Sequence, residues 1–356
     1  MKSDFIPLTF DVTSPKIRSA REEWKPHARM THKSYEWWYL TANAYDVAGN
    51  EYFIFFDIVN RPGEGWQQQY NVPPKHTLVR IVGRVSNYDK NHSFAIDGTN
   101  IVSENTLWDR AKHAVLCNAG DYSASWSYQD SFMNLVMKSP NVCFDFLLQN
   151  VDEVVWHKDK LGVEGMIQQG AEDDFSFYYS LMRTPFTGKL IYTDEQEVKH
   201  EVMLNGMAWV DRQWGDFFTL SWEWSSFRFA NGARLHLYNF FNGHQEAVYL
   251  TTEGEKVNFT NVIVKQNGYV RSPQVGTWVS CGWSYEFPIE IEGSKHYTVI
   301  PRSEKDFLES LDLNFALYEG SCRLINDETG EQVGVSINES ADIRIMDNGP
   351  YGKNQK

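Results

Sequence analysis

The sequence lacks several features that mark large classes of protein. No uninterrupted apolar stretch approaches the roughly 18 residues that a membrane-spanning helix needs, so we expect no integral membrane segment. The first residues, MKSDFIP, hold no apolar run of the length found in the centre of a signal peptide. This absence makes the cytoplasm the expected location.

Positive charge is also scarce. The 33 Lys and Arg residues stand against 47 Asp and Glu residues, which gives a net charge of −14 over 356 residues. A surplus of negative charge repels the phosphate backbone of nucleic acids and anionic lipid. We therefore expect no nucleic-acid partner.

Metal-binding and nucleophilic signatures are missing as well. The four cysteines form no C-x-x-C pair, and the ten histidines stand singly, without the spacing of metal ligands. The motifs G-x-S-x-G, H-E-x-x-H and G-x-x-x-x-G-K-[ST] do not occur. The sequence therefore indicates chemistry without a metal or cofactor, although it leaves open a metal site assembled from distant strands. Hydrolase activity ranks lowest, since no activated nucleophile is visible.

Aromatic residues, by contrast, are abundant. The chain holds 13 Trp, 18 Tyr and 22 Phe. So much flat apolar surface must fill cores or line a pocket. We expect the partner to be a hydrophobic small molecule that binds as a substrate, and the sequence leaves the oligomeric state open.

Short runs of β-branched and aromatic residues, separated by Gly, Asn, Asp or Pro, predict an all-β fold built from antiparallel sheets. Residues 52–56 and 78–85 have the composition and alternation of strands. Two aromatic hairpins are expected, one over residues 35–55 and one over residues 222–241. The second turns at Asn231-Gly232, which suits a type I′ hairpin.

The two hairpins suggest two similar halves that pack closely; the alternative is a chance similarity between two aromatic hairpins, because the spacing from tryptophan to turn differs. No Pro- or Ser-rich linker separates them, and the polar stretch at residues 193–200 is the best place for a boundary. We therefore predict an N-terminal β domain over residues 1–200, a C-terminal β domain over 201–345 and a polar tail over 346–356. Helices are few and short, with one expected at residues 304–311.

One carboxylate lies inside an aromatic run near the N-terminus. Strand alternation places Glu36 and Trp38 on one face and Trp37 and Tyr39 on the other. A carboxylate among indoles is a candidate catalytic group. The alternative is that Glu36 is exposed or pairs with an arginine while the aromatic residues fill the core.

A second carboxylate stands beside a tryptophan in the middle of the chain. Trp209 and Asp211 share a face if they lie on one strand. Burial beside an indole raises the pKa of a carboxylic acid, so that it can keep a proton and act as a general acid. Asp211 is the proton donor that we predict. The alternative is that Asp211 pairs with Arg212 or caps a turn.

Aromatic faces can also stabilise the carbocation that forms when a carbon–carbon double bond is protonated, by about 1 to 2 kcal/mol each. Most of the rings must fill the core, but some suit this role. The aromatic residues that we expect to contact the substrate are Trp37, Trp38, Tyr39, Tyr178, Tyr179, Trp209, Trp214 and Trp224.

Four segments, in this order, resemble the lipocalin-like superfamily. They are Glu36-Trp37-Trp38-Tyr39, Gly206 through Gly215, Trp222-x-Trp224 and Asn231-Gly232. That superfamily contains carotenoid 1,2-hydratases, AttH-type proteins, kievitone hydratase and fungal Diels-Alderases. The resemblance covers roughly residues 30 to 345 and implies an N-terminal β-sandwich or distorted barrel followed by a lipocalin-like β-barrel.

The resemblance also suggests chemistry. The hydratases of the superfamily place a Tyr-x-Asp at the position of Trp209-Val210-Asp211, with the aspartate as proton donor. The aspartate carries over to this chain, but the tyrosine does not. An indole cannot relay a proton as a hydroxyl can, so the missing phenol counts against hydration.

Three functions follow. The first is a cofactor-independent enzyme that hydrates or isomerises a double bond of a terpenoid, carotenoid or polyketide, with Asp211 as acid and Glu36 as its partner or base. The second is a pericyclic cyclase of the Diels-Alderase type in secondary metabolism, in which the pocket supplies orientation. The third is a non-catalytic carrier of an apolar ligand.

Overall fold

A computed structural model describes residues 19–27, 34–159, 162–169, 174–217, 222–241, 243–310 and 315–341. Nearly all regular structure is β, and it forms two curled antiparallel sheets, as the sequence predicted. The chain divides into two compact units. The first comprises Met1–Trp156 with Asp174–Phe217, and the second His157–Asp173 with Phe218–Lys356.

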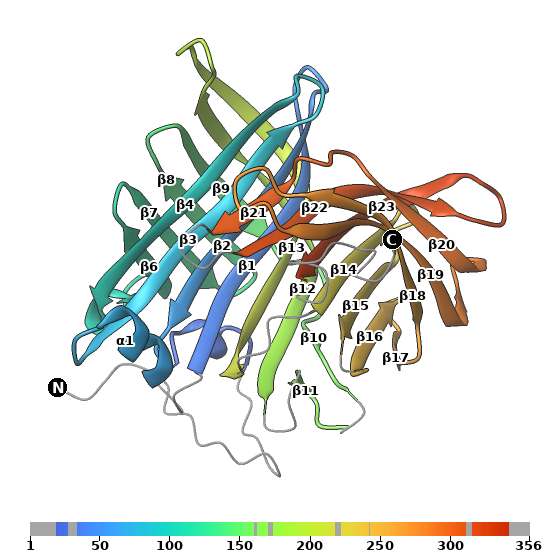
Figure 1. Ribbon diagram of the computed structural model, residues 1–356, viewed down its shortest axis with the longest axis horizontal. Coiled ribbons are helices and arrows are strands. Elements are labelled where there is room, and N and C mark those ends of the chain that lie inside the picture. The colour runs from blue at the N-terminus through green and yellow to red at the C-terminus, as the bar shows by residue number, and fades with distance from the viewer. Residues whose placement is uncertain are drawn as a thin grey trace, which may run out of the picture. The chain divides into compact units, whose positions relative to one another are not determined.

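The first unit is built on one curled sheet with the strand order β4-β3-β2-β1-β13-β12-β9-β8-β7-β6-β5, and both β10 and β11 (Met166–Gln168) pair with β12 (Figure 1). Its strands are β1 (Ser34–Asp46), β2 (Glu51–Arg61), β3 (His76–Asn87), β4 (His92–Ser103), β5 (Trp108–Asp109), β6 (Ala114–Ala119), β7 (Tyr122–Gln129), β8 (Phe132–Lys138), β9 (Val142–Gln149), β10 (Val155–Trp156), β12 (Phe175–Thr193) and β13 (Lys199–Asp216). Its helices are short: α1 (Glu64–Tyr70) and the 3-10 turns Glu22–Trp24 and Glu104–Thr106.

The second unit is a curled sheet with the strand order β17-β16-β15-β14-β23-β22-β20-β19-β18, and β21 pairs with β22 (Figure 1). Its strands are β14 (Trp222–Phe229), β15 (Arg234–Phe240), β16 (Gln245–Leu250), β17 (Lys256–Phe259), β18 (Ile263–Arg271), β19 (Trp278–Ile291), β20 (Ser294–Pro301), β21 (Phe307–Ser310), β22 (Phe315–Asn326) and β23 (Gln332–Ala341).

The core of the second unit lies on one face of its sheet. Alternate residues of β14, β15 and β19, among them Phe227, Leu235, Leu237 and Trp283, form one buried cluster. Residues between them, such as His236, point to the other face because successive side chains of a strand alternate. That other face is also buried at this position, since His236 is fully covered.

Both predicted hairpins are present. The first is β1–β2, and the second is β14–β15. In the second turn only Gly232 has a positive φ, 107°, whereas a type I′ turn needs two such residues. The type I′ prediction is therefore wrong, and the three-residue loop ends on a single glycine instead.

The expected helix at residues 304–311 is wrong. Residues 307–310 form β21, which pairs with β22. Phe307 is buried in the core of the second unit and contacts Tyr318 edge-on. An isolated helix of eight residues is only marginally stable in water, so pairing with an existing strand and burial of a ring outweigh the helical spacing.

The boundary between the two units differs from the predicted one at residue 200. The polar stretch at residues 193–200 is the tip of the β12–β13 hairpin, whose strands pair from Phe175↔Asp216 to Thr193↔Lys199. The units divide instead after Phe217, and residues 157–173 belong to the second. A polar turn is typical of hairpin tips as well as linkers, so composition could not separate the two. The predicted tail at residues 346–356 lies outside the described residues.

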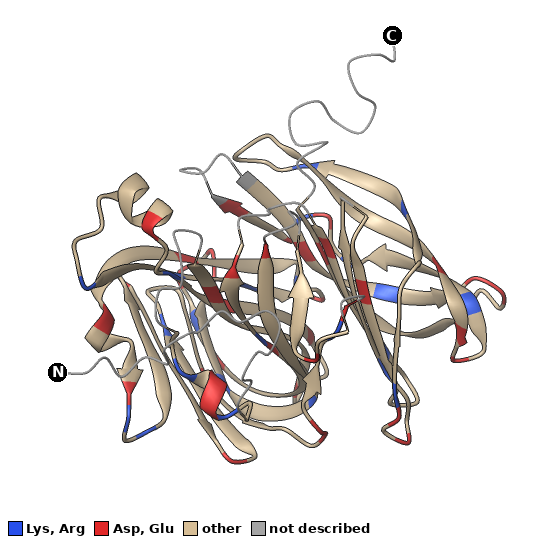
Figure 2. Cartoon of the chain, turned by 90° about the horizontal axis from the view of Figure 1, so that it is seen from below, with Lys and Arg blue, Asp and Glu red and all other residues tan. Residues whose placement is uncertain are grey.

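Acidic and basic residues are interspersed over the strands and turns of both units (Figure 2). No helix in the described ranges has the length and apolar character needed to cross a membrane.

Candidate functional site

Asp211 lies near the middle of the sheet of the first unit. Its strand, β13, runs between β1 and β12, and Asp211 stands opposite Tyr39 on one side and Ser180 on the other. Residues directly opposite each other in antiparallel strands point to the same face. Asp211, Tyr39 and Ser180 therefore share one face of the sheet.

The Asp211 carboxyl group is buried and accepts hydrogen bonds from Trp209, Ser180 and Tyr178. Its side chain belongs to a residue that is 2% exposed. Oδ1 accepts from the Trp209 indole N–H at 2.7 Å and from the Ser180 hydroxyl at 2.5 Å. Oδ2 accepts from the Tyr178 hydroxyl at 2.6 Å. Three donors from two strands hold the carboxyl group in one orientation.

The donors around Asp211 differ in whether they can also accept a hydrogen bond. An indole N–H can only donate, whereas a phenol can donate or accept. The Tyr178 hydroxyl, which donates to Oδ2, can therefore also accept a hydrogen bond from a protonated carboxyl group, whereas Trp209 can only donate to Oδ1. On β13, Trp209 stands where the hydratases of the superfamily have the tyrosine of Tyr-x-Asp. The Asp211 carboxyl group nevertheless contacts a phenol, that of Tyr178 on β12.

Gln213 follows Asp211 on the same face, two residues along β13. It is 1% exposed, and its Nε2 donates to the Ser176 hydroxyl at 2.7 Å. Its Oε1 is buried and accepts no hydrogen bond from any residue that the structure describes. The site thus holds a hydrogen-bond acceptor, Gln213 Oε1, in addition to the Asp211 carboxyl group.

Two more of the predicted aromatic residues lie on the Asp211 face. Trp37 stands opposite Gln213, and Tyr39 stands opposite Asp211. Trp37 is half-buried and meets Tyr35 and Phe217 edge-on, at centroid distances of 5.4 Å each. With Tyr178 and Trp209, they bring four of the eight predicted substrate-binding residues to this face.

The other predicted residues of this unit lie on the opposite face, around Arg212. Glu36 stands opposite Trp214, and Trp38 stands opposite Arg212. The Arg212 guanidinium carbon lies 3.9 Å from the centre of the Trp38 ring and 5.3 Å from that of Trp214. Tyr179, also opposite Arg212, donates its hydroxyl to the carbonyl of Ala20 at 2.9 Å. The structure therefore separates Glu36 from Asp211 by the thickness of a sheet.

Glu36 is an ion-pair partner. Its carboxylate accepts from Arg212 at 2.5 Å, from the Asn60 amide at 2.7 Å and from the His27 backbone N–H at 3.1 Å. Burial opposes ionisation, but the Arg212 charge and the contacts with His27 lower the pKa of Glu36 below its usual range. This is the alternative considered for Glu36, a pair with an arginine. Arg212 is thereby engaged away from its sequence neighbour Asp211.

The sequence did not identify Ser180 or Gln213. A signal was present, because Ser180 follows Tyr178 at the two-residue spacing of one strand face, and Gln213 follows Asp211 in the same way. That β12 pairs with β13 in this register was not visible, since thirty-one residues separate Ser180 from Asp211.

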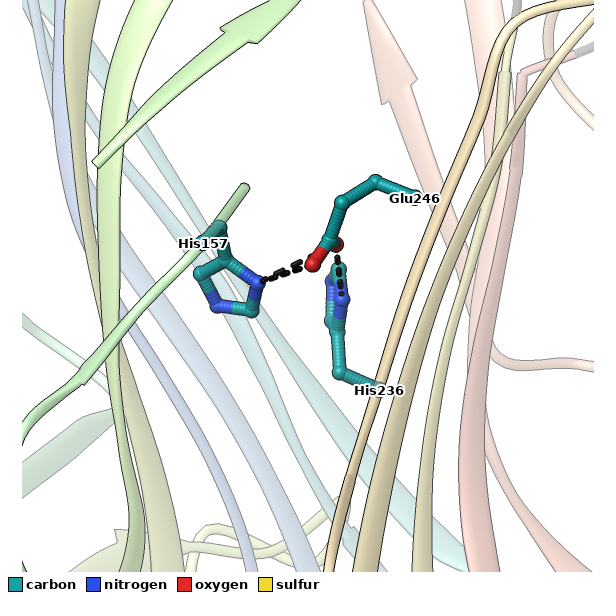
Figure 3. Close-up of side chains that lie close together, drawn as sticks. All are labelled: His157, His236 and Glu246. Carbon is teal, nitrogen blue, oxygen red and sulfur yellow. Dashed lines mark hydrogen bonds and ion pairs between the residues drawn. The ribbon is translucent and has the colours of Figure 1, made fainter. Parts of the chain in front are cut away.

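The second unit holds a different cluster of polar side chains, His157, His236 and Glu246 (Figure 3). His157 Nδ1 lies 3.1 Å from both carboxylate oxygens of Glu246, and His236 Nδ1 lies 2.8 Å from Oε2. Burial lowers the pKa of His157 to about 4, although Glu246 counteracts it. Burial opposes ionisation of Glu246 too, but the two imidazoles lower its pKa. His157 is therefore neutral and Glu246 ionised at pH 7.

Trp224, the remaining predicted substrate-binding residue, packs in this second unit. Its ring lies 5.8 Å from that of His236. Trp224 therefore belongs to the surroundings of the histidine cluster in its own unit. Imidazole nitrogens and a carboxylate are also ligands that transition metals prefer, so these three residues could hold an ion.

The outer part of the first unit has a hollow of about 540 Å³. It lies on β8, β9, β12 and β13, and its lining includes Met137, Phe144, Leu147, Thr187 and Met203. It shares no residue with the Asp211 group.

Comparison with known proteins gives a family and a fold. A family model described as AttH-like matches residues 18–335. A crystal structure of a candidate AttH protein from Nitrosomonas europaea superposes with a TM-score of 0.71 at 15% identity, covering 94% of this chain and 98% of that one. Kievitone hydratase from Nectria haematococca superposes with a TM-score of 0.64 at 15% identity, covering 86% and 89%. No curated protein sequence matches the chain.

Proposed function

This chain belongs to the AttH-like family, and from that premise we propose that it is a hydratase, an enzyme that adds water across a carbon–carbon double bond. The membership confirms the resemblance found in the sequence motifs. The observation that carries the proposal is the buried Asp211 carboxyl group, which accepts a hydrogen bond from the Tyr178 hydroxyl. Kievitone hydratase, a protein of the same fold, supports the reaction class.

The proposed reaction begins with Asp211 protonated on Oδ2. The carboxyl proton passes to one alkene carbon, whose π electrons form the new C–H bond and leave a carbocation on the neighbouring carbon. The oxygen of a water molecule then bonds to the cationic carbon. The proton that this water sheds returns to the carboxylate, directly or through the Tyr178 hydroxyl. One water has been added, and the acid is restored.

The neighbours of Asp211 have distinct roles in this scheme. Trp209 and Ser180 stabilise the carboxylate that forms when the proton leaves, since both donate to Oδ1. The faces of Tyr39 and Trp37, on the same side of the sheet, suit the carbocation, by about 1 to 2 kcal/mol each where water is excluded. Gln213 Oε1 is an acceptor for the water that attacks.

The substrate that we propose is a hydrophobic alkene of the terpenoid, carotenoid or polyketide class. Such molecules carry electron-rich double bonds that form tertiary or conjugated cations on protonation. The aromatic side chains of Tyr39, Tyr178 and Trp209 lie beside Asp211 on its face of the sheet, which suits an apolar substrate. Glu36 has no direct part in this reaction, because it lies on the opposite face.

The test is the variant Asp211→Asn, assayed against a panel of apolar alkenes in isotopically labelled water. We expect wild-type protein to give a product that has gained one labelled water, detected by mass spectrometry. The variant should lose about 10²-fold to 10⁴-fold in kcat, the usual contribution of a general acid. The matched control is Asp145→Asn, which changes an exposed aspartate of the same unit on β9.

Other outcomes would favour the alternatives. A product that is an isomer of the substrate, with a rate that Asp211→Asn leaves unchanged and a stereochemistry that Trp209→Ala alters, indicates a pericyclic cyclase. Tight binding of alkenes that are all recovered unchanged indicates a carrier. Either result contradicts the hydratase proposal.

A further inference from the structure

His157, His236 and Glu246 are brought together by the fold of one unit. His236 lies on β15 and Glu246 on the neighbouring β16, where the register pairs His236 with Val248 and Tyr238 with Glu246. His236 and Glu246 are therefore diagonal neighbours on one face, opposite the apolar core formed by Leu235 and its cluster. Two strands of a sheet fix two of the three side chains.

The third side chain comes from the segment that follows β10. The backbone carbonyl of His157 accepts a hydrogen bond from the Gly165 N–H at 2.6 Å. The Asp159 carboxylate accepts from the Gln168 backbone N–H at 2.7 Å. These bonds hold the described part of the segment in a turn that presents His157 to the strands (Figure 3).

The three side chains are enclosed. His157 and His236 are fully buried, and Glu246 is 1% exposed. The rings of Trp224 and Tyr238 lie 5.8 Å and 5.7 Å from that of His236. An aromatic surround keeps water away and strengthens the interaction between a cation and its ligands.

The spacing suits a metal ion. Bonds of about 2.0 to 2.2 Å from a metal to nitrogen and oxygen place neighbouring ligand atoms roughly 3.0 to 3.5 Å apart. The separations here, from Glu246 to the two imidazoles, are 2.8 to 3.1 Å. The candidate ligand atoms all lie within 4.8 Å of one another. Binding of an ion requires the two imidazole nitrogens to move slightly away from the Glu246 carboxylate.

The donor set distinguishes this cluster from the other buried carboxylates. Glu36 forms an ion pair with the Arg212 guanidinium, and Asp211 accepts hydrogen bonds from hydroxyl and indole groups. None of these partner groups is a good metal ligand. Within the described ranges, His157, His236 and Glu246 are the one group of three such ligand side chains at this spacing. Two imidazoles with one carboxylate favour zinc or iron(II) over magnesium or calcium, which prefer oxygen.

We propose that His157, His236 and Glu246 bind one divalent first-row transition-metal ion, through Nδ1 of each imidazole and the carboxylate of Glu246. Three protein ligands leave at least one coordination position for water or a second ligand. The ion also ties the segment around His157 to β15 and β16. The proposed ligands belong to the second unit and Asp211 to the first.

The first experiment measures metal binding to the full chain after treatment with a chelator. Zn²⁺, Co²⁺, Fe²⁺, Mn²⁺, Mg²⁺ and Ca²⁺ are each titrated by calorimetry. We expect one equivalent of Zn²⁺ or Co²⁺ to bind, and Mg²⁺ and Ca²⁺ to bind at least about 100-fold more weakly. Absence of binding by Zn²⁺, Co²⁺ and Fe²⁺ overturns the proposal, and the cluster is then a hydrogen-bonded structural group.

Two variants test the ligands. His236→Gln and Glu246→Gln should each weaken binding of Zn²⁺ at least about 100-fold, since loss of a residue that merely supports a ligand already costs 10-fold to 100-fold. The matched controls, His296→Gln and Glu286→Gln, change exposed residues of the same unit and should bind as wild type does. Equal binding by the ligand variants and the controls overturns the proposal.

A spectroscopic measurement on wild-type protein covers the case in which the variants do not fold. The Co²⁺ form should show the intense visible absorption of a four- or five-coordinate ion, and X-ray absorption should show scattering from two imidazoles. A weak octahedral spectrum without imidazole scattering contradicts the assignment. Loss of Asp211 activity would leave both results unchanged, so the two proposals fail separately.

Discussion

At the scale of single residues, the two buried carboxylates near the centre of the first sheet differ in what surrounds them. In the hydrogen bonds that the structure describes, Asp211 accepts from the neutral side chains of Trp209, Ser180 and Tyr178, whereas Glu36 meets the Arg212 guanidinium. Arg212 also donates to the carbonyls of Glu23, Lys25 and Trp37, so the pair organises backbone from distant segments. A group with neutral partners can exchange a proton, and a group locked to an arginine contributes to stability instead.

We expect Glu36→Gln to lower the free energy of unfolding by about 3 to 5 kcal/mol, because it leaves the buried Arg212 charge without its partner. Urea unfolding at pH 7 measures the loss. The matched control is Glu201→Gln, which removes an exposed ion pair with Lys189 and should cost less than about 1 kcal/mol. A loss for Glu36→Gln as small as that of the control would contradict the buried-pair interpretation.

The same pair predicts a pH dependence. The pKa of Glu36 is lower in the folded state than its ordinary value of 4.5. Ionised Glu36 therefore contributes fully to the free energy of unfolding above pH 4.5, and this contribution is lost as the pH falls through the lowered pKa. The stability difference between wild type and Glu36→Gln should therefore narrow below about pH 4. A constant difference from pH 7 to pH 3 would show that ionisation of Glu36 has no part in it.

At the scale of elements, local patterns predicted the hairpins well and the long-range pairings not at all. The β1–β2 and β14–β15 hairpins followed from two aromatic runs flanking a turn. The pairing of β1 with β13 joins residues such as Tyr39 and Asp211, which no local pattern connects. The sequence therefore identified Asp211 as a candidate and missed Ser180, whose place depends on the equally distant pairing of β12 with β13.

Strand β13 also needs a glycine beside β12. A Cβ on Gly215 would lie 2.6 Å from Ser176 Cα, closer than such atoms approach. Gly215→Ala should push β12 away, destabilise the protein by about 1 to 3 kcal/mol and reduce activity, because Tyr178 and Ser180 lie on β12. Thermal unfolding and the alkene assay check both effects.

The matched control for Gly215→Ala is Gly268→Ala in the second unit. The nearest atom to a Cβ there, Cys281 Sγ, is 3.4 Å away, an ordinary contact. We expect the control to change the free energy of unfolding by less than about 1 kcal/mol. Equal effects of the two substitutions would mean that β12 can move away from a Cβ at residue 215 without loss of stability.

At the scale of the whole molecule, the sequence predicted two β domains but not how the chain is shared between them. The segment at residues 157–173 belongs to the second unit although the first unit resumes at Asp174. Composition changes little along the chain, and a segment that leaves one unit and returns gives no linker signal. The cluster of His157, His236 and Glu246 was not predicted either, because its members come from distant parts of the chain: His157 and Glu246 are 89 residues apart in sequence.

Each unit has its own principal sheet, so we expect the two units to open separately under denaturant. Cysteines report on this: Cys117 is buried in the first unit, and Cys281 and Cys322 lie in the core of the second. Burial raises the pKa of Cys117 to about 12 and that of Cys281 to about 11, so these thiols are unreactive in the folded state. The half-buried Cys143 should react first.

Labelling with a thiol reagent at increasing urea concentration, read by mass spectrometry of peptides, tests that expectation. Cys281 and Cys322 should become reactive together, because they share one core, and Cys117 should do so at a different urea concentration. The variant Cys143→Ser removes the thiol that is expected to react in the folded protein and leaves the three buried thiols unchanged. A single urea concentration at which all three buried thiols become reactive would instead show that the molecule unfolds as one cooperative unit.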